Sequence, residues 1–246
     1  MVIFLHVPRT GGTTIVELLR TCLRPSICID GTEDLRFLAN LPEDKCRILR
    51  LAYGHMPYGL HRIIPMACRY VVFLRDPVDR VMSAYRYIQQ TPEHPWFSKL
   101  RSGSTMEEFA RYHENEQTRQ LAVYDFAGAI REENRSWGIT PYTSSILLDE
   151  AKGNLKKCNF IGLFEEFEKD VLRLFSFLDL SPPVTIPKLN RSEIGPSIFN
   201  LNARDMRTVR AYLRLDIEMY DYARSLRQES MELHPDRSYA GKIIDL

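Results

Sequence analysis

The stretch His6-Val7-Pro8-Arg9-Thr10-Gly11-Gly12-Thr13-Thr14 lies between two segments of different character. Before its prolyl turn, residues 2–7 form a short apolar run with β-branched side chains, which is typical of a buried strand. After its glycines, residues 13–23 carry apolar side chains at the 3.6-residue spacing of an amphipathic helix. The pattern therefore predicts a strand, a tight glycine loop and a helix.

This glycine loop has the features of an anion-binding site. Glycines let backbone N–H groups approach a ligand, the following helix offers unpaired N–H donors, and threonine hydroxyls add further donors. It is not a Walker A loop, because its cationic residue precedes the glycines. Gly-Gly alone would indicate no more than a turn, but with the flanking residues we expect a phosphate-type ligand to contact Arg9, Thr10, Gly11, Gly12, Thr13 and Thr14.

Apolar runs and helical patterns alternate along the rest of the chain. We expect strands at 26–30, 48–53, 69–74 and 160–163, and helices at 105–112, 142–157, 165–178 and, as one or two helices, 202–227. This alternation predicts βαβ units, and hence a P-loop-like three-layer α/β/α sandwich with a central parallel β-sheet. We expect residues 1–246 to form a single domain, with surface insertions at the weakly patterned segments 98–105 and 126–140.

A second basic motif follows the strongest predicted strand. Arg75 ends that strand, and ligands of open α/β sheets bind at the carboxyl ends of the strands. Asp76 is placed to cap the next helix, on which Arg80, Ser83 and Tyr87 face away from the apolar stripe. Ser83 is therefore expected to be free to bind a ligand. The alternative is a solvated helix face with an ion pair between Asp76 and Arg80.

Composition limits the partners and the compartment. Lys and Arg number 33 against 32 Asp and Glu, so a net charge of +1 does not favour nucleic acid or an acidic membrane. The five cysteines form no CxxC pair or zinc-binding cluster, and they indicate reduced, mostly buried thiols. The sequence shows no apolar run of the roughly 20 residues needed to span a bilayer and no signal peptide. We expect a soluble, cytoplasmic protein.

The motifs, in this order, resemble those of the carbohydrate-type sulfotransferases. That family includes the heparan-sulfate 2-O- and 6-O-sulfotransferases and soluble bacterial relatives. Its phosphosulfate loop, Lys-Thr-Gly-Gly-Thr between a strand and a helix, is matched by residues 9–13, with Arg9 in place of the lysine. Its motif Arg-Asp-Pro-x-x-Arg-x-x-Ser is matched by residues 75–83. The similarity covers nearly the whole chain, continuing through 115–121, 151–155, 160–163, 165–167 and 216–223.

This resemblance implies an enzyme that uses 3′-phosphoadenosine 5′-phosphosulfate (PAPS) and releases 3′-phosphoadenosine 5′-phosphate (PAP). A sulfuryl group would pass in line to a hydroxyl of a saccharide or another small alcohol. Arg9 and its loop would hold the 5′-phosphosulfate, Arg75 and Ser83 the 3′-phosphate, and Arg191 would contact the nucleotide from a late loop. The scheme requires no metal and no nucleic-acid partner. The acceptor and the oligomeric state stay open.

His55 is the expected catalytic base. It follows a predicted strand, and relatives place their base in the equivalent segment. Independently, an acceptor hydroxyl must lose a proton as it attacks, and histidine suits that task near neutral pH. An isolated histidine is more often structural, and this is the role we expect for His6 in the first strand.

Two other functions stay open at this point. An atypical P-loop kinase or NTPase would need a Mg²⁺-binding partner and a lysine after the glycines. A catalytically inactive nucleotide-binding homologue is also compatible with the arginine at position 9. A comparison of PAP with ATP and Mg²⁺ separates the kinase or NTPase from a sulfotransferase, since only a sulfotransferase should prefer PAP. Loss of sulfuryl transfer in His55→Ala, with nucleotide binding retained, would separate an active enzyme from the inactive homologue.

Overall fold

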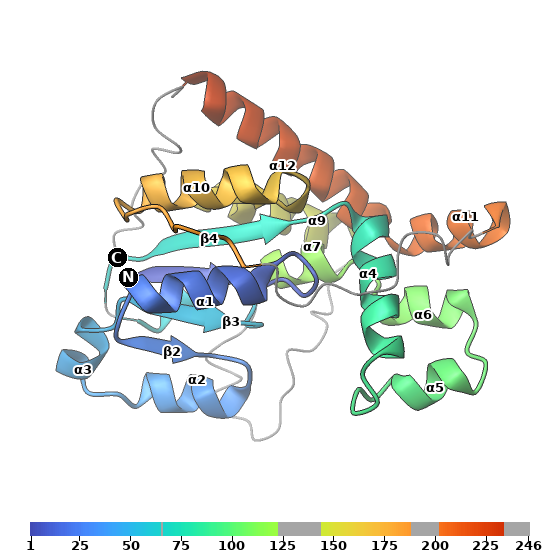
Figure 1. Cartoon of the computed structure of the whole chain (residues 1–246), viewed down its shortest axis with the longest axis horizontal. Helices are drawn as coiled ribbons and strands as arrows, with labels where there is room; N and C mark the ends of the chain where they lie inside the picture. The colour runs from blue at the N-terminus through green and yellow to red at the C-terminus, as the bar shows by residue number, and fades with distance from the viewer. Residues whose placement is uncertain (65, 123–143, 188–201, 234–246) are drawn as a thin grey trace.

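The computed structural model describes residues 1–64, 66–122, 144–187 and 202–233 (Figure 1). Within these ranges a five-stranded parallel sheet has the order β2-β3-β1-β4-β5. Its strands are β1 (Val2–Leu5), β2 (Ser26–Cys28), β3 (Leu51–Gly54), β4 (Arg69–Leu74) and β5 (Phe160–Leu163). Because β1 pairs with both β3 and β4, the loops after these three strands open side by side at one edge.

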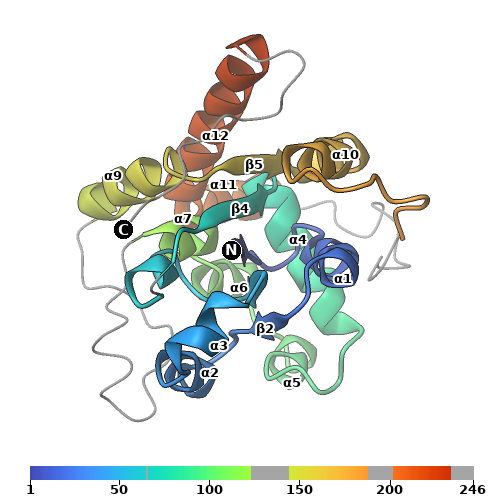
Figure 2. The ribbon, with the colours of Figure 1, turned by 90° about the vertical axis from the view of Figure 1, so that its left-hand side faces the viewer.

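Helices cover both faces of the sheet (Figure 2). α1 (Gly12–Cys22) and α10 (Phe167–Phe177) pack on one face. The other face is covered by α2 (Thr32–Ala39), α3 (Glu43–Arg47), α7 (Glu116–Leu121), α9 (Ser144–Leu155) and α12 (Arg214–Leu233). The sequence of β4 explains this arrangement, since Val71 and Phe73 enter one core while Tyr70, Val72 and Leu74 enter the other.

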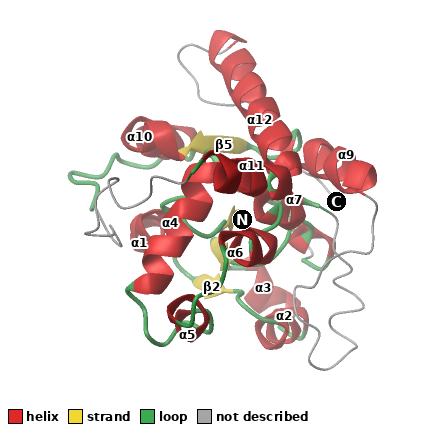
Figure 3. Cartoon of the chain, turned by 90° about the vertical axis from the view of Figure 1, so that its right-hand side faces the viewer, coloured by secondary structure: helices red, strands yellow, loops and turns green. Residues whose placement is uncertain are grey.

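A smaller core extends the carboxyl edge of the sheet (Figure 3). It is built by α4 (Pro77–Gln89), α5 (Phe97–Arg101), α6 (Met106–Tyr112) and α11 (Ala203–Tyr212). Two 3₁₀ helices, η1 (Leu60–Arg62) and η2 (Phe164–Glu166), follow β3 and β5. α4 follows β4 in the chain and shares this core with α5, α6 and α11, which we call the helical extension.

The three-layer sandwich predicted from the sequence is confirmed, and the predicted strands 69–74 and 160–163 agree residue for residue with β4 and β5. The segment 98–105, predicted as a surface insertion, is mostly exposed, although it is partly helical, because α5 begins at Phe97 and packs Phe97 and Leu100 against α6. The other predicted insertion, 126–140, lies outside the described residues. Helices α2 and α3 have no counterpart in the sequence prediction.

The cysteines are all free thiols, and Cys46, Cys68 and Cys158 are buried. This agrees with the expected reduced, mostly buried state. In the described ranges no helix has both the length and the apolar character needed to cross a bilayer.

Candidate active site

The glycine loop turns sharply from β1 into α1. Arg9 has a φ of 69° and Gly11 a φ of 84°, so two nearby residues adopt the left-handed region. A Cβ at Gly11 would lie 2.4 Å from the Phe167 ring, and one at Gly12 would lie 1.9 Å from the His6 ring. Both glycines are therefore required by close packing as well as by the turn.

The N-terminus of α1 opens onto this loop. Its N-cap residue is Gly11, which has no side chain to cap it, and no acidic residue lies in its first turn. Its first N–H groups and the positive end of its dipole are thus available to an anion. This agrees with the anion site expected from the sequence.

The loop threonines differ from one another. The buried Thr10 hydroxyl donates to the Val7 carbonyl at 2.8 Å, and the Thr14 hydroxyl donates to the Pro187 carbonyl at 3.1 Å. Each hydroxyl hydrogen is therefore engaged by backbone. The expected contacts of these two threonines with the ligand stay a prediction, and in this structure both hydroxyls are bonded to the backbone. Thr13 is exposed at the start of the helix.

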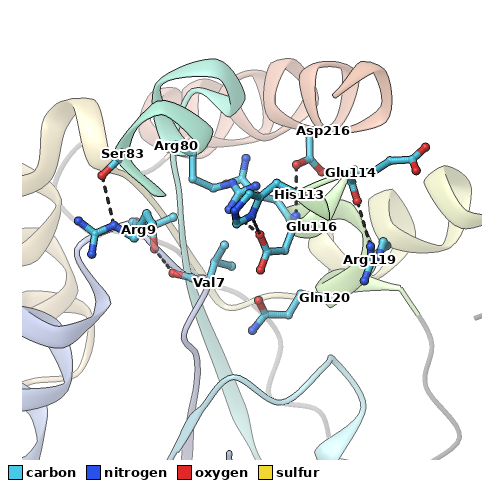
Figure 4. Close-up of polar contacts among 12 residues, drawn as sticks. Val7, Arg9, Arg80, Ser83, His113, Glu114, Glu116, Arg119, Gln120 and Asp216 are labelled. Atoms are coloured by element: carbon cyan, nitrogen blue, oxygen red, sulfur yellow. Dashed lines mark hydrogen bonds and ion pairs between the residues drawn. The ribbon is translucent and has the colours of Figure 1, made fainter. Parts of the chain in front are cut away.

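Two arginines from different strand ends meet beside the loop. The Arg75 Nη1 donates to the Arg9 carbonyl at 3.2 Å, and its guanidinium lies 4.2 Å from the centroid of the Phe164 ring. The Arg9 Nε donates to the Ser83 hydroxyl at 3.2 Å (Figure 4), and its guanidinium lies 4.5 Å from the Tyr87 ring. The two motifs singled out in the sequence are therefore in direct contact.

Neither of these arginines forms an ion pair within the described part of the chain. Burial lowers the pKa of Arg75, and burial together with the charge of Arg75 lowers the pKa of Arg9. The Arg75 Nε is buried and has no hydrogen-bond partner among the residues that the structure describes. The site thus holds two partly buried positive charges and an unmet donor, which an anionic ligand would compensate.

The alternative of a solvated α4 face does not hold at Arg80 and Ser83, which are both buried. Arg80 is 0% exposed, and its Nη1 donates to Glu116 Oε2 at 2.8 Å. The ion pair between Asp76 and Arg80, which belonged to that alternative, is not formed, because the Asp76 carboxylate accepts the N–H groups that begin α4. The reason is that Glu116, which begins α7, lies against this part of α4 and pairs with Arg80. Ser83 is also buried, and it accepts the bond from Arg9 rather than being unengaged.

His55 is exposed at the end of β3 and is held at two points. Its backbone N–H donates to Asp30 Oδ1 at 2.9 Å, and its ring Nδ1 lies 2.8 Å from the His6 carbonyl oxygen. Because a carbonyl oxygen can only accept, Nδ1 must carry the hydrogen in this contact. The lone pair is then on Nε2, which is the form of histidine that accepts a proton.

His6 lies beneath His55, with ring centroids 4.4 Å apart. Burial, and then the neighbouring His55, lowers the pKa of His6 to about 3. His6 is therefore neutral near pH 7. Its ring occupies the space that a side chain at position 12 would need. This packing agrees with the structural role expected for His6.

A cavity of about 410 Å³ adjoins the glycine loop. The sequence reasoning did not identify its aromatic wall, formed by Phe164 and Phe167. The available signal was the Phe-x-x-Phe pattern directly after the predicted strand at 160–163. The remaining lining residues are Gly11, Thr14, Glu165, Glu166, Glu168, Lys169, Ile186 and Pro187.

Arg191 lies outside the described residues, so its predicted contact is not placed. Among the residues that are described, no group of three His, Cys, Asp or Glu side chains is arranged to hold a metal ion.

The family model described as "Sulfotransferase family" matches residues 1–223, so the chain belongs to the sulfotransferase family. Heparan-sulfate 6-O-sulfotransferase 2 of Danio rerio is 27% identical, covering 92% of this chain and 58% of that protein. The 6-O-sulfotransferases 1 of Cricetulus griseus and Homo sapiens are each 26% identical over 93% of this chain, and over 67% and 66% of their own lengths. This chain thus spans about three fifths to two thirds of these relatives.

Among solved structures, mouse sulfotransferase SULT7A1 complexed with PAP aligns with a TM-score of 0.47 and 13% identity. The alignment covers 92% of this chain and 88% of the mouse chain. That likeness is too low to bear on the site. The family resemblance predicted from the motifs is confirmed by the family match and the curated relatives.

Proposed function

We propose that this protein transfers a sulfuryl group from PAPS to a hydroxyl group, with His55 as the general base. The observation that carries this proposal is the contact between Arg9 and Arg75 at the glycine loop. Two partly buried guanidinium groups without an ion pair among the described residues need negative charge from a ligand. A nucleotide with phosphate at both its 3′ and 5′ positions supplies charge to both.

The described residues fit such a nucleotide at three points. Arg9 and the first N–H groups of α1 would bind the 5′-phosphosulfate, because they converge on the glycine loop. Arg75 and Ser83 would bind the 3′-phosphate, and the unpartnered Arg75 Nε is a donor for it. The cavity beside Gly11, with its aromatic wall, would receive the adenosine. Phe164 joins these regions, since it lines the cavity and contacts Arg75.

The bound donor supplies the sulfuryl group, and PAP is the leaving group. The His55 Nε2 would accept the proton of the acceptor hydroxyl as that oxygen attacks, because Nδ1 is already committed to the His6 carbonyl. Arg9 and the N–H groups of α1 would stabilise the charge that develops on the leaving phosphate. The work of the protein is thus mainly positioning and charge stabilisation.

We assign the acceptor to the saccharides or other small alcohols. The three relatives named above are heparan-sulfate 6-O-sulfotransferases, which supports a saccharide hydroxyl as the acceptor. His55 is exposed, which supports access by an external hydroxyl.

Two measurements on the wild-type chain test this proposal. Calorimetry should show that PAP binds more tightly than ATP with Mg²⁺, and a preference for ATP would contradict a PAPS donor. A screen with [³⁵S]PAPS and neutral, aminated and acidic saccharides, together with simple alcohols, should yield a labelled ester. If PAP binds but no acceptor is labelled, the assigned acceptor class is wrong.

A further inference from the structure

Helix α7 directs two buried glutamines to two different loops of the site. The first is Gln117, whose Nε2 donates to the Arg75 carbonyl at 2.9 Å and whose Oε1 accepts from the Arg75 N–H at 3.1 Å. The side chain thus pairs with both backbone polar groups of Arg75, as a neighbouring strand would. Gln117 is 0% exposed, so water does not replace these bonds.

The second is Gln120, one helical turn further on. Its Nε2 donates to the His6 carbonyl at 3.2 Å and to the Met56 carbonyl at 3.2 Å. The His6 carbonyl is the same group that accepts from His55 Nδ1. A carbonyl oxygen has two lone pairs, so Gln120 and His55 together use the acceptor capacity of His6. Gln120 is thereby linked to His55 through His6 and through the adjacent Met56.

Helix α7 is itself held by reciprocal contacts with α12. The Asp216 carboxylate accepts from the N–H groups of Gln117 at 3.3 Å and Thr118 at 2.7 Å. In the other direction, Asn115 Oδ1 accepts from the N–H groups of Leu215 at 2.9 Å and Asp216 at 3.2 Å. Figure 4 shows Asp216 above this segment and Gln120 below it. The two glutamines therefore project from a helix whose N-terminus is fixed by buried partners.

We propose that α7 positions the catalytic base and the nucleotide site separately. Gln120 favours the proton-accepting tautomer of His55 through the His6 carbonyl, and Gln117 fixes the position of the Arg75 backbone. This inference rests on the proposed roles of His55 and Arg75. Without the amide of Gln120, the His6 and Met56 carbonyls lose the donor that joins them, and the His6 carbonyl is held less firmly in line with His55 Nδ1. His55 then also populates the tautomer with its hydrogen on Nε2. In that tautomer Nε2 has no lone pair with which to accept the hydroxyl proton.

Three glutamine-to-methionine variants, which nearly conserve side-chain volume, test whether the two glutamines act separately. Gln120→Met and Gln117→Met change α7, and Gln90→Met, at the exposed end of α4, is the control. The readouts are kcat at saturating PAPS, the Kd for PAP, and the tautomer of His55 from ¹⁵N NMR of histidine-labelled protein. The spectrum of His55→Ala assigns the His55 signal. Thermal unfolding of each variant identifies any general loss of structure.

We expect Gln120→Met to lower kcat on the order of tenfold or more, to mix the His55 tautomers and to leave the Kd for PAP within about twofold. Gln117→Met should raise the Kd for PAP about tenfold and leave the His55 tautomer unchanged. Gln90→Met should change none of these quantities. If both glutamines had a purely structural role, each of the two α7 variants would instead change kcat and the Kd for PAP together.

The inference is overturned if both α7 variants change kcat and the Kd for PAP in parallel, or if neither changes them. If Gln120→Met does not fold, the wild-type spectrum decides, because the inference requires the His55 hydrogen on Nδ1 and fails if it is on Nε2. Full transfer by His55→Ala would overturn the proposed function and this inference together. Loss of transfer in His55→Ala with normal kcat in Gln120→Met would overturn this inference alone.

Discussion

The Arg9 side chain donates to the Ser83 hydroxyl at 3.2 Å, although the two residues are 74 positions apart in the chain. This bond joins the glycine loop after β1 to the helix after β4. The same guanidinium lies against the Tyr87 ring, one helical turn beyond Ser83. The planar shape of arginine is thus used in two contacts at once.

The first prediction concerns that shape. We expect Arg9→Lys to lower kcat/KM for PAPS about tenfold, because a lysine ammonium keeps the charge but not the Nε bond and the stacked plane. Arg9→Ala should lower it by a further factor of ten or more, since the charge is also lost. Tyr87→Leu should lower kcat/KM for PAPS about two- to fivefold, which corresponds to about 0.5–1 kcal/mol of lost cation–π stabilisation. Steady-state kinetics checks all three, and full activity of Arg9→Lys would show that the planar contacts are not used.

The second prediction separates the two ends of the nucleotide. Arg75→Ala should weaken PAP binding by about 2 kcal/mol, roughly thirtyfold, because a charged hydrogen bond to the 3′-phosphate is lost. Binding of 5′-AMP, which lacks that phosphate, should change much less. Calorimetry with both nucleotides measures the difference, with the exposed Arg101→Ala as the control. An equal loss for PAP and 5′-AMP would show that Arg75 does not read the 3′-phosphate.

The third prediction compares two glycines at helix positions. In Gly12→Ala the new methyl group would meet the His6 ring at 1.9 Å, so the ring must move, and it lies directly beneath His55. We expect lower stability by about 1–3 kcal/mol and a lower kcat. Gly153→Ala, in the helix α9, meets nothing within 4 Å and should stabilise the protein by about 0.5–1 kcal/mol with unchanged kcat.

Urea unfolding and steady-state kinetics measure both glycine variants. A Gly12→Ala protein with wild-type stability and kcat would show that the packing of the loop on His6 is not required.

The fourth prediction is a dependence of stability on pH. Burial would raise the pKa of Glu116, but Arg80 and the hydrogen bond from His113 lower it well below its ordinary value of 4.5. The unfolded chain therefore binds a proton on this carboxyl at a higher pH than the folded chain does. The stabilisation is present above pH 4.5 and is lost as the pH falls below it.

Glu116→Gln should remove that dependence and leave the buried Arg80 charge without its anionic partner. We expect a loss of about 3 kcal/mol at pH 7 that shrinks as the pH falls from 5 toward 3. Urea unfolding at several pH values measures the difference between variant and wild type. A difference that stays constant over this range would contradict the assigned ion pair.

Much of the fold was predictable from local patterns. Residues 70–74 are continuously apolar because both faces of β4 are covered, and Asp76-Pro77 marks the start of α4. The burial of Arg80 was not predictable, because it depends on Glu116 and His113, which come from a later part of the chain. Helical periodicity indicates where a side chain points, but not what packs against it.

The meeting of the proposed site residues at one edge of the sheet was predictable to a similar degree. Arg9, Arg75 and His55 follow three adjacent strands, so the parallel sheet brings their loops together. The connections that set their geometry were not visible in the sequence. Gln117 and Gln120 act through backbone groups of residues that are distant in the chain, and no local pattern identifies such partners.

The central claim is that His55 accepts the proton of the acceptor hydroxyl after PAPS has bound at the glycine loop. The most direct measurement is transfer of ³⁵S from PAPS to an acceptor by wild type and His55→Ala, with the Kd for PAP measured on the same samples. The predicted result is a loss of transfer of at least a hundredfold in His55→Ala, with the Kd for PAP unchanged within about twofold. Undiminished transfer by His55→Ala would contradict the claim.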